Sequence, residues 1–436
     1  MGSKNLIALY TIMIVFILAS FALQWFPIDL LQSGSPHLEI PQESDAPVSL
    51  SIWLWDDDAP ISERIYEDFL RANPHVSLEF SIFHIRDYKQ LLRAALASGQ
   101  KIDIFNVDRA EQLSSMIEEG WLYPLNDMIR EERFDTSIYG TQFDRIKYQG
   151  TAYALPYRFS VFSIAYNKNM FRERGVPFPH DHMTWDELAE LAALMTFEQD
   201  GRHVYGINLI NRIFDNFFMA FQDGRTLVDD NLDLFARSLQ FRVDLISSGV
   251  SISPDDYEGR FIRREFEQEA MAMYITADWT INQMRESYRN GDMHFDFDVV
   301  MLPSADGRRF GRSFGQQSFI AVSATSENPK EAFRLAAHYA GMPGARRFAE
   351  GGLLPGVIGN QEIVDLFIGD STQAPVNIRA FVNQSTHLIM PVLPGIEALN
   401  DIFLEEAELA ARMQKSVEAA MDAIRERRRE LMKNYL

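Results

Sequence analysis

The residues after position 47 alternate between short apolar strands and helices, and this alternation constrains the fold more than any other feature of the sequence. Every second side chain over residues 48–55 lies on one apolar face, which is typical of a strand. The predicted elements are a strand over 48–55, a helix over 61–70, a strand over 75–83, a helix capped by Asp87 and ended by Gly99, and a strand over 102–107. This order predicts an α/β fold with helices on both faces of a sheet.

Two later helices carry signals for their N-termini. Thr184 with Glu187, and Asn328 with Glu331, have the three-residue spacing of a capping box. In such a box each side chain accepts a hydrogen bond from the backbone of the other residue. From Gly395 to the C-terminus the pattern is helical throughout.

The charge of the chain limits its partners. The 62 acidic and 41 basic residues give a formal net charge of -21. A surface of this sign repels phosphate backbones, so we expect no nucleic-acid partner. The chain has no cysteine, which excludes disulfides, thiolate metal sites and a lipid-modified cysteine.

The N-terminal segment predicts export from the cytoplasm. Residues 6–26 carry no charge, Lys4 precedes them, and the next basic residue is Arg64. This asymmetry places the N-terminus inside and the rest of the chain outside. The length favours an uncleaved membrane anchor, while the small residues at 20–22 offer the alternative of a cleaved signal peptide. The polar, proline-containing residues 27–47 are typical of a tether.

Signatures of several catalytic classes are absent from the sequence. It contains no phosphate-binding loop and no His-Glu-x-x-His pattern. His180 and His182 lie close together in a polar loop, but no third metal ligand is suggested nearby. No metal or other cofactor is therefore implied.

A glycine- and arginine-rich stretch over residues 307–317 predicts a loop or hairpin. Its arginines are solvated in the simplest interpretation, and a contact with ligand is the alternative. We count Gly315, Gln316 and Gln317, at its end, among the candidate ligand-binding residues.

Aromatic and acidic residues gather at the ends of predicted elements. Each aromatic taken alone is explained by core packing, and each aspartate of 56–58 by a solvated turn or a helix cap. Together, an aromatic face and carboxylates suit a sugar, whose C–H face stacks on a ring and whose hydroxyls donate to acids. Ligands of open α/β sheets bind at the carboxyl ends of strands. The candidates from this pattern are Trp53, Trp55, Asp56, Asp57, Tyr157, Phe214, Phe217 and Trp279.

Several segments occur in an order that resembles a known family. Among them are "VSLSIWLWDD", "LLRAALASGQKIDIFNVD", "GTAYALPYRFSVFSIAYNKNMFRERGV", "AMAMYITADWTI" and "SFIAVSATSENPKEAFRLAAHYAG". The series resembles the family 1 extracellular solute-binding proteins, the carbohydrate-binding components of ABC importers. The resemblance implies a type II periplasmic-binding-protein fold with two lobes that close on ligand. It assigns 1–26 to the signal peptide or anchor, 27–47 to the tether, 48–155 and 304–341 to lobe one, and 156–303 and 342–436 to lobe two.

The resemblance also implies roles for particular residues. The loop after "IDIFNV" looks like the one whose aspartate binds sugar hydroxyls, here Asp108 with Arg109 behind it. "ITADW" looks like the stretch that supplies a stacking tryptophan, here Trp279. Phe214 and Phe217 resemble aromatics of the second lobe that face the ligand.

Three functions remain open at this stage. The first is a monomeric extracytoplasmic receptor that binds an oligosaccharide and delivers it to ABC permease subunits in the membrane. The second is a sugar sensor that stays on its anchor and signals to a partner. The third is a carbohydrate-active enzyme on the same fold, which a carboxylate pair across the cleft would favour.

Overall fold

The computed structural model describes residues 46–209, 212–257, 262–304, 312–369 and 375–433 of the 436-residue chain. The predicted anchor and most of the tether lie outside these ranges, as do Arg308 and Arg309. Within the described ranges, no helix combines the length and the apolar composition needed to cross a membrane. Residues 47–436 form one compact unit, which is described below.

A 10-stranded sheet organises this unit, with the main strand order β2-β1-β3-β9-β4-β7-β6-β5. In that order the strands are Val76–Phe83, Val48–Trp55, Ile104–Val107, Arg312–Val322, Ala154–Asn167, Met271–Ala277, Arg202–Asn208 and Phe197–Gln199. β8 (Phe297–Met301) pairs with β4, and β10 (Ser385–Leu388) pairs with β9. β1 is parallel to β2 and β3, whereas β9 is antiparallel to both β3 and β4.

The predicted alternation of strands and helices is confirmed over the first 60 described residues. Helix α2 (Ala59–Ala72) contains the helix predicted over 61–70, and α3 (Ile85–Ala97) connects β2 to β3. The start of α3 was predicted wrongly, because His84 is its N-cap and accepts a hydrogen bond from the backbone of Arg86. Asp87 therefore lies inside the first turn, where its negative charge still interacts favourably with the helix dipole.

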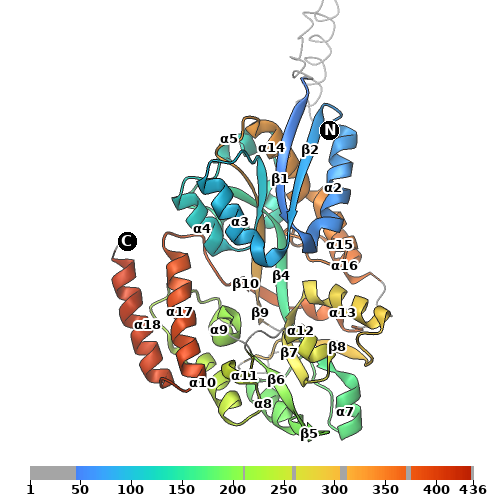
Figure 1. The fold of residues 1–436 in the computed structure, drawn as a ribbon, viewed down its shortest axis with the longest axis vertical. Helices are drawn as coiled ribbons and strands as arrows, with labels where there is room; N and C mark the ends of the chain where they lie inside the picture. Colours follow the sequence, from blue (N-terminus) through green and yellow to red (C-terminus); the bar gives the residue numbers. More distant parts are fainter. Residues whose placement is uncertain (1–45, 210–211, 258–261, 305–311, 370–374, 434–436) are drawn as a thin grey trace, which may run out of the picture. The chain divides into compact units, whose positions relative to one another are not determined.

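Helices follow through the rest of the chain (Figure 1). They are α4 (Ala110–Glu118), α5 (Asn126–Glu131), α6 (Gln142–Arg145), α7 (Lys168–Arg174), α8 (Trp185–Leu194), α9 (Ile213–Gln222), α10 (Asp233–Ser247), α11 (Pro254–Tyr257), α12 (Ile262–Glu267), α13 (Asp278–Asn290), α14 (Pro329–Ala340), α15 (Met342–Glu350), α16 (Gln361–Ile368), α17 (Ile396–Ala411) and α18 (Val417–Met432). Short 3-10 turns form η2 (Asp56–Asp58), η3 (Thr136–Tyr139) and η4 (Ile378–Phe381). The helical character predicted after Gly395 is confirmed by α17 and α18.

Strand β4 joins two groups of elements. Its residues 154–161 pair with β9, and its residues 162–167 pair with β7 on one side and β8 on the other. Figure 1 shows β4 and β9 running between the elements around β1–β3 and those around β5–β8. All 14 residues of β4 are buried, so side chains that point to opposite faces of this strand reach two different interiors.

One of the two predicted capping boxes is present. The Thr184 side chain accepts from the backbone of Glu187, and the Glu187 carboxylate accepts from the backbone of Thr184 over 2.7 Å. Asn328 is the N-cap of α14 but makes no capping hydrogen bond with its side chain. The backbone at Asn328 has a φ of -125° and a ψ of 55°, outside the extended conformation that a capping side chain usually has.

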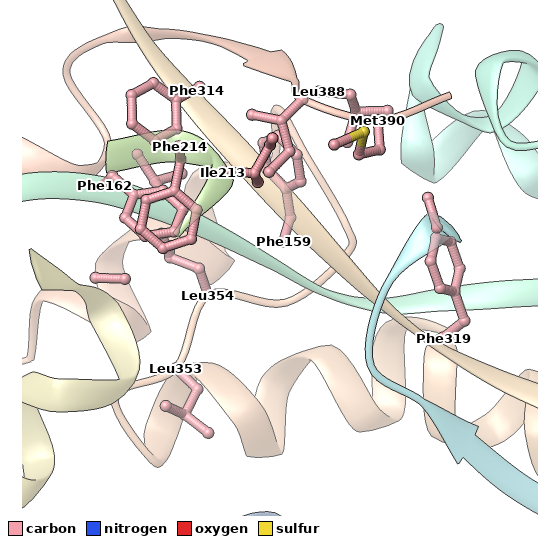
Figure 2. Close-up of a cluster of buried hydrophobic side chains, with 14 of the residues drawn as sticks. Phe159, Phe162, Ile213, Phe214, Phe314, Phe319, Leu353, Leu354, Leu388 and Met390 are labelled. Carbon is pink, nitrogen blue, oxygen red and sulfur yellow. The ribbon is translucent and has the colours of Figure 1, made fainter. Parts of the chain in front are cut away.

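An apolar cluster lies where β4, β9 and α9 meet (Figure 2). The ring of Phe162 lies 4.2 Å from Phe214 and 5.0 Å from Phe314, between ring centroids. It also meets Trp279 edge to face at 5.6 Å. Because these rings come from four different elements, their packing fixes the start of α9 and α13 against the sheet.

Helix α15 packs against α2 and α14. Both of those helices belong to the predicted first lobe, whereas residues 342–436 were assigned to the second. The lobe boundaries stay predictions.

Candidate ligand-binding site

A cavity of about 680 Å³ lies where the ends of β1 and β3 face α9, α13 and α17. Its volume falls within the range of small-molecule sites, about 300–1,000 Å³. Its lining contains Trp55, Asp57, Asp58, Ile61, Ile85, Asp108, Arg109, Arg158, Ser160, Arg212, Ile213, Phe214, Trp279, Asn282, Gln283, Glu286, Arg289, Gln316, Ser318, Leu353, Asn400 and Leu404.

The end of β1 supplies an aromatic ring and a carboxylate. Trp55 is the last residue of the strand, and the ring of Tyr88 meets it edge to face at 5.3 Å. Asp57 follows in turn η2, has no hydrogen-bond or ion-pair partner among the described residues, and lies at the cavity. Partial burial, together with the neighbouring Asp56 and Asp58, raises the pKa of the Asp57 carboxyl above its ordinary value.

The loop between β3 and α4 supplies a second carboxylate. Arg109 Nε donates to Asp108 Oδ2 over 2.9 Å, and Glu111 lies 3.8 Å from the same guanidinium. Asp108 is the main cause of the raised pKa of Arg109. The pairing holds the Asp108 carboxylate at the wall and leaves its other oxygen available as an acceptor.

A buried group of charges forms part of the cavity floor. Arg158 Nη1 donates to Asp58 Oδ1 over 2.7 Å, and Arg158 Nη2 lies 3.7 Å from Asp278 Oδ2. The two acids come from η2 and α13, whereas the arginine belongs to β4. Burial alone would lower the pKa of Arg158, but Asp58 and Asp278 raise it, so the guanidinium stays charged. Burial is also the main cause of the raised pKa of the Asp278 carboxyl, which Arg158 partly offsets.

The opposite wall combines rings with cationic and amide groups. The Arg212 guanidinium lies 4.4 Å above the Phe214 ring and donates from Nε to Asp215 over 2.6 Å. Trp279 stands at the start of α13 and is partly buried. Gln316 belongs to β9, and its side chain has no hydrogen-bond partner among the described residues. The same holds for a further group of lining side chains: Gln283, Glu286 and Arg289.

Seven of the predicted site residues line this cavity together: Trp55, Asp57, Asp108, Arg109, Phe214, Trp279 and Gln316. The structure places the six others elsewhere.

Three of these six belong to β1, to the turn after it, and to β4. Trp53 is two residues short of the strand end and is buried against the Phe83 ring at 4.5 Å. Asp56 turns away from the cavity and accepts a hydrogen bond from the backbone of Ile85, at the start of α3. Tyr157 is buried and donates to Asp58 Oδ2 over 2.9 Å, so it supports the floor from behind.

The other three lie in α9 and β9. Phe217 is one turn after Phe214 and points into the core, where Phe403 meets it at 5.3 Å. The segment predicted as a loop is strand β9 from Arg312 onward. Strand alternation therefore turns Gly315 and Gln317 away from the wall that contains Gln316. A side chain at position 315 would come within 2.7 Å of the Phe159 ring.

Sequence reasoning missed the central charges of the floor. Asp58 is the third member of an acidic run, and only the turn geometry shows that it is buried while Asp57 is not. Arg158 and Ser160 alternate with apolar residues in β4. This alternation could have indicated from the sequence that the two polar side chains share one face of the strand. Asn400 comes from α17, which is remote in sequence and gave no signal.

The fold and the cavity define a two-lobe α/β binding protein. Residues 54–345 match the family described as bacterial extracellular solute-binding protein, and the chain belongs to that family. A binding protein of Brucella abortus is 23% identical over 359 residues, which cover 79% of this chain and 82% of the relative.

Solved structures agree on the fold. A substrate-binding protein of an ABC system from Listeria monocytogenes, in complex with cycloalternan, has a TM-score of 0.78 at 21% identity and covers 89% of this chain and 99% of its own. A sugar transporter from Rhizobium etli, in an open conformation, has a TM-score of 0.74 at 22% identity, with coverages of 87% and 98%. The family is extracellular, so the chain is extracytoplasmic.

Proposed function

We propose that the chain captures a carbohydrate in the cavity and delivers it to an ABC importer. The observation that carries this proposal is the combination of ring faces with unpartnered polar groups in one space. Trp279 supplies a partly exposed ring, beside Trp55 and Phe214 in the wall, which are 2% and 4% exposed. Asp57 and Gln316 supply side-chain polar atoms that no described residue satisfies.

Sugars match this combination better than other small solutes do. A hydroxyl both donates and accepts, so it can satisfy carboxylates, amides and guanidinium groups in one site. The C–H face of a pyranose ring covers an aromatic side chain. The proteins from Listeria monocytogenes and Rhizobium etli, described respectively with cycloalternan and as a sugar transporter, support the same class of ligand.

Thermal melting of the purified chain against a panel of mono- and oligosaccharides tests the ligand class. A ligand of the native state raises the melting temperature by mass action. A panel of amino acids and dicarboxylates of similar size is the control. Stabilisation by that panel alone would exclude a carbohydrate ligand.

The proposal includes the absence of catalysis. We expect the bound sugar to be recovered unchanged after prolonged incubation, as measured by chromatography and mass spectrometry. Release of shorter sugars at a rate proportional to protein concentration would favour the carbohydrate-active enzyme instead.

We further propose that residues 6–26 anchor a monomeric receptor beside its membrane permease. Their length and flanking charge suit a spanning helix whose N-terminus is cytoplasmic. Fractionated cells should then hold the protein in the membrane with Met1 or Gly2 at its N-terminus. A soluble form that begins at Leu23 would show cleavage. Ligand-dependent crosslinking to a permease subunit would separate an importer from a sensor.

A further inference from the structure

Arg158 lies where strand β4 passes from one group of elements to the other. Its Nη1 donates to Asp58 of turn η2, which belongs to the predicted first lobe. On its other side lies Asp278, the first residue of α13 in the predicted second lobe. The guanidinium therefore stands between two carboxylates that come from different predicted lobes.

The two ion pairs of Arg158 differ in geometry. The bond to Asp58 is 2.7 Å long, whereas Nη2 lies 3.7 Å from Asp278 Oδ2, beyond hydrogen-bond distance. Arg158 Nε and Asp278 Oδ1 are buried and have no hydrogen-bond partner among the described residues. Nε and Nη2 form one edge of the guanidinium, and such an edge can donate two parallel bonds to a carboxylate. The second pair is thus incomplete, and a bidentate pair would join its unused atoms.

The incomplete pair is unfavourable in the conformation of the structure. Asp278 is fully buried, and only its Oδ2 accepts a bond, from the backbone of Leu354 over 3.0 Å. A buried donor or acceptor without a partner costs free energy. Shortening the separation of Arg158 and Asp278 by about 0.8 Å would bring it to hydrogen-bond length and remove this cost.

Strand β4 has the features of a bending point beside Arg158. Its register with β9 shifts between Pro156 and Arg158, and an extra residue of this kind bends a strand. The strand pairs with β9 up to Val161 and with β7 from Phe162 onward. Asp278 follows the last residue of β7, so it moves with the second part of β4. A bend between the two parts changes the distance from Arg158 to Asp278.

The direction of the change follows from the position of the pair. Arg158 and Asp58 line the cavity, so they lie on the inner side of a bend that closes it. Groups on the inner side of a bend approach each other. Trp279 follows Asp278 directly, and its ring lines the cavity. A sugar that draws this ring inward therefore also moves Asp278 toward Arg158.

We propose that closure of the cavity completes the Arg158–Asp278 pair, and that Asp278 is a positioning residue which stabilises the closed conformation without touching the sugar. The inference rests on the proposed function, because it requires two lobes that close on a carbohydrate. A bond that forms only in the closed conformation shifts the equilibrium toward that conformation. The bound sugar is then released more slowly.

Asp278→Asn tests the proposal, because it keeps the size of the side chain and removes its charge. The probe is the sugar that raises the melting temperature most in the carbohydrate panel, which includes maltotriose and cycloalternan. We expect affinity to fall by about five- to fiftyfold. The loss should lie in the dissociation rate, measured by stopped-flow tryptophan fluorescence, because the pair forms after the encounter.

Asp298→Asn is the matched control. Asp298 is also buried in the predicted second lobe and accepts a backbone hydrogen bond, from Asn377 over 2.9 Å, but it does not line the cavity. Its replacement should leave both rate constants unchanged. An equal rise in the dissociation rate in Asp298→Asn would show general destabilisation and overturn the proposal.

Arg158→Lys completes a double-variant cycle. Lysine keeps a cation beside Asp58 but has no two-donor edge for Asp278. Arg158 also lines the cavity, so its own loss can include a contact with sugar. If the pair is coupled, Arg158→Lys with Asp278→Asn should lose less affinity than the two single losses together. Additive losses, or wild-type affinity in Asp278→Asn, would overturn the inference alone. A panel in which no sugar binds the wild-type chain would instead contradict the proposed function, and the inference with it.

Discussion

Arg158 Nη1 and Asp58 Oδ1 form a buried ion pair, 2.7 Å apart, in which 7% of the arginine side chain and 1% of the aspartate side chain are exposed. The pair links β4 to the turn after β1, and Tyr157 donates a second hydrogen bond to the same carboxylate. Replacing a buried pair of this kind by well-packed apolar residues often costs no stability, but removing one partner leaves an uncompensated buried charge. We therefore expect the contributions of Arg158 and Asp58 to the unfolding free energy to be strongly coupled.

Arg158→Met tests this dependence. The variant should lose about 3–5 kcal/mol of unfolding free energy, because Asp58 stays buried without its cation. Urea denaturation without ligand gives the measurement. Adding Asp58→Asn to the same chain removes the stranded charge and should recover much of the loss. The single variant Asp58→Asn completes the cycle: if the losses of the two single variants simply add in the double variant, the two side chains are not coupled.

Trp279 and Phe217 form a matched pair of aromatic substitutions. Trp279→Ala should reduce sugar affinity by about 2–4 kcal/mol, or roughly thirty- to a thousandfold, because it removes a ring from the cavity. Phe217→Ala should leave affinity unchanged but reduce stability by about 3–5 kcal/mol, because its ring is fully buried among other rings. Calorimetry and urea denaturation on both variants separate the effects. Lost stability with unchanged affinity in Trp279→Ala would make it a packing residue.

Asp57 should make binding depend on pH. Its pKa is raised above the ordinary value by partial burial and by Asp56 and Asp58. As a carboxylate it accepts hydroxyl protons, so affinity should be full above the raised pKa and should fall as the pH drops through it. The fall should begin at a higher pH than an ordinary aspartate would give. Asp57→Asn should bind more weakly at neutral pH and lose this dependence. An unchanged pH profile in Asp57→Asn would exclude Asp57 as the titrating group.

The two helix caps give a further comparison. Thr184→Ala should cost about 1 kcal/mol, because it removes a side-chain cap that is present in the structure. Asn328→Ala should cost much less, since its side chain makes no capping hydrogen bond. The measurement is the urea midpoint of each variant at constant slope. Equal losses would show that the side chain of Asn328 also caps its helix in solution.

Local patterns were enough to predict the α/β class and much of one cavity wall. Trp55 ends one strand, and Asp57 and Asp108 follow strands whose carboxyl ends meet, so the proximity of the three could be inferred from chain order alone. Phe217 and Gln317 were wrongly predicted to bind ligand, because the direction in which a side chain points depends on the exact register of its helix or strand. The partner of a buried charge is harder still: Asp58 and Arg158 are 100 residues apart, and no local pattern joins them.

The alternation of β4 has a consequence for tolerated changes in chain length. Its two faces contribute to separate spaces, with Arg158 and Ser160 toward one and Phe159 and Val161 toward the other. Inserting or deleting one residue in this stretch would exchange the faces, placing a guanidinium against an apolar wall and a phenyl ring in a polar cavity. Inserting two residues would preserve the faces and mainly shift the pairing with β9. The chemistry of both spaces is thus tied to whether the number of residues in one strand is odd or even.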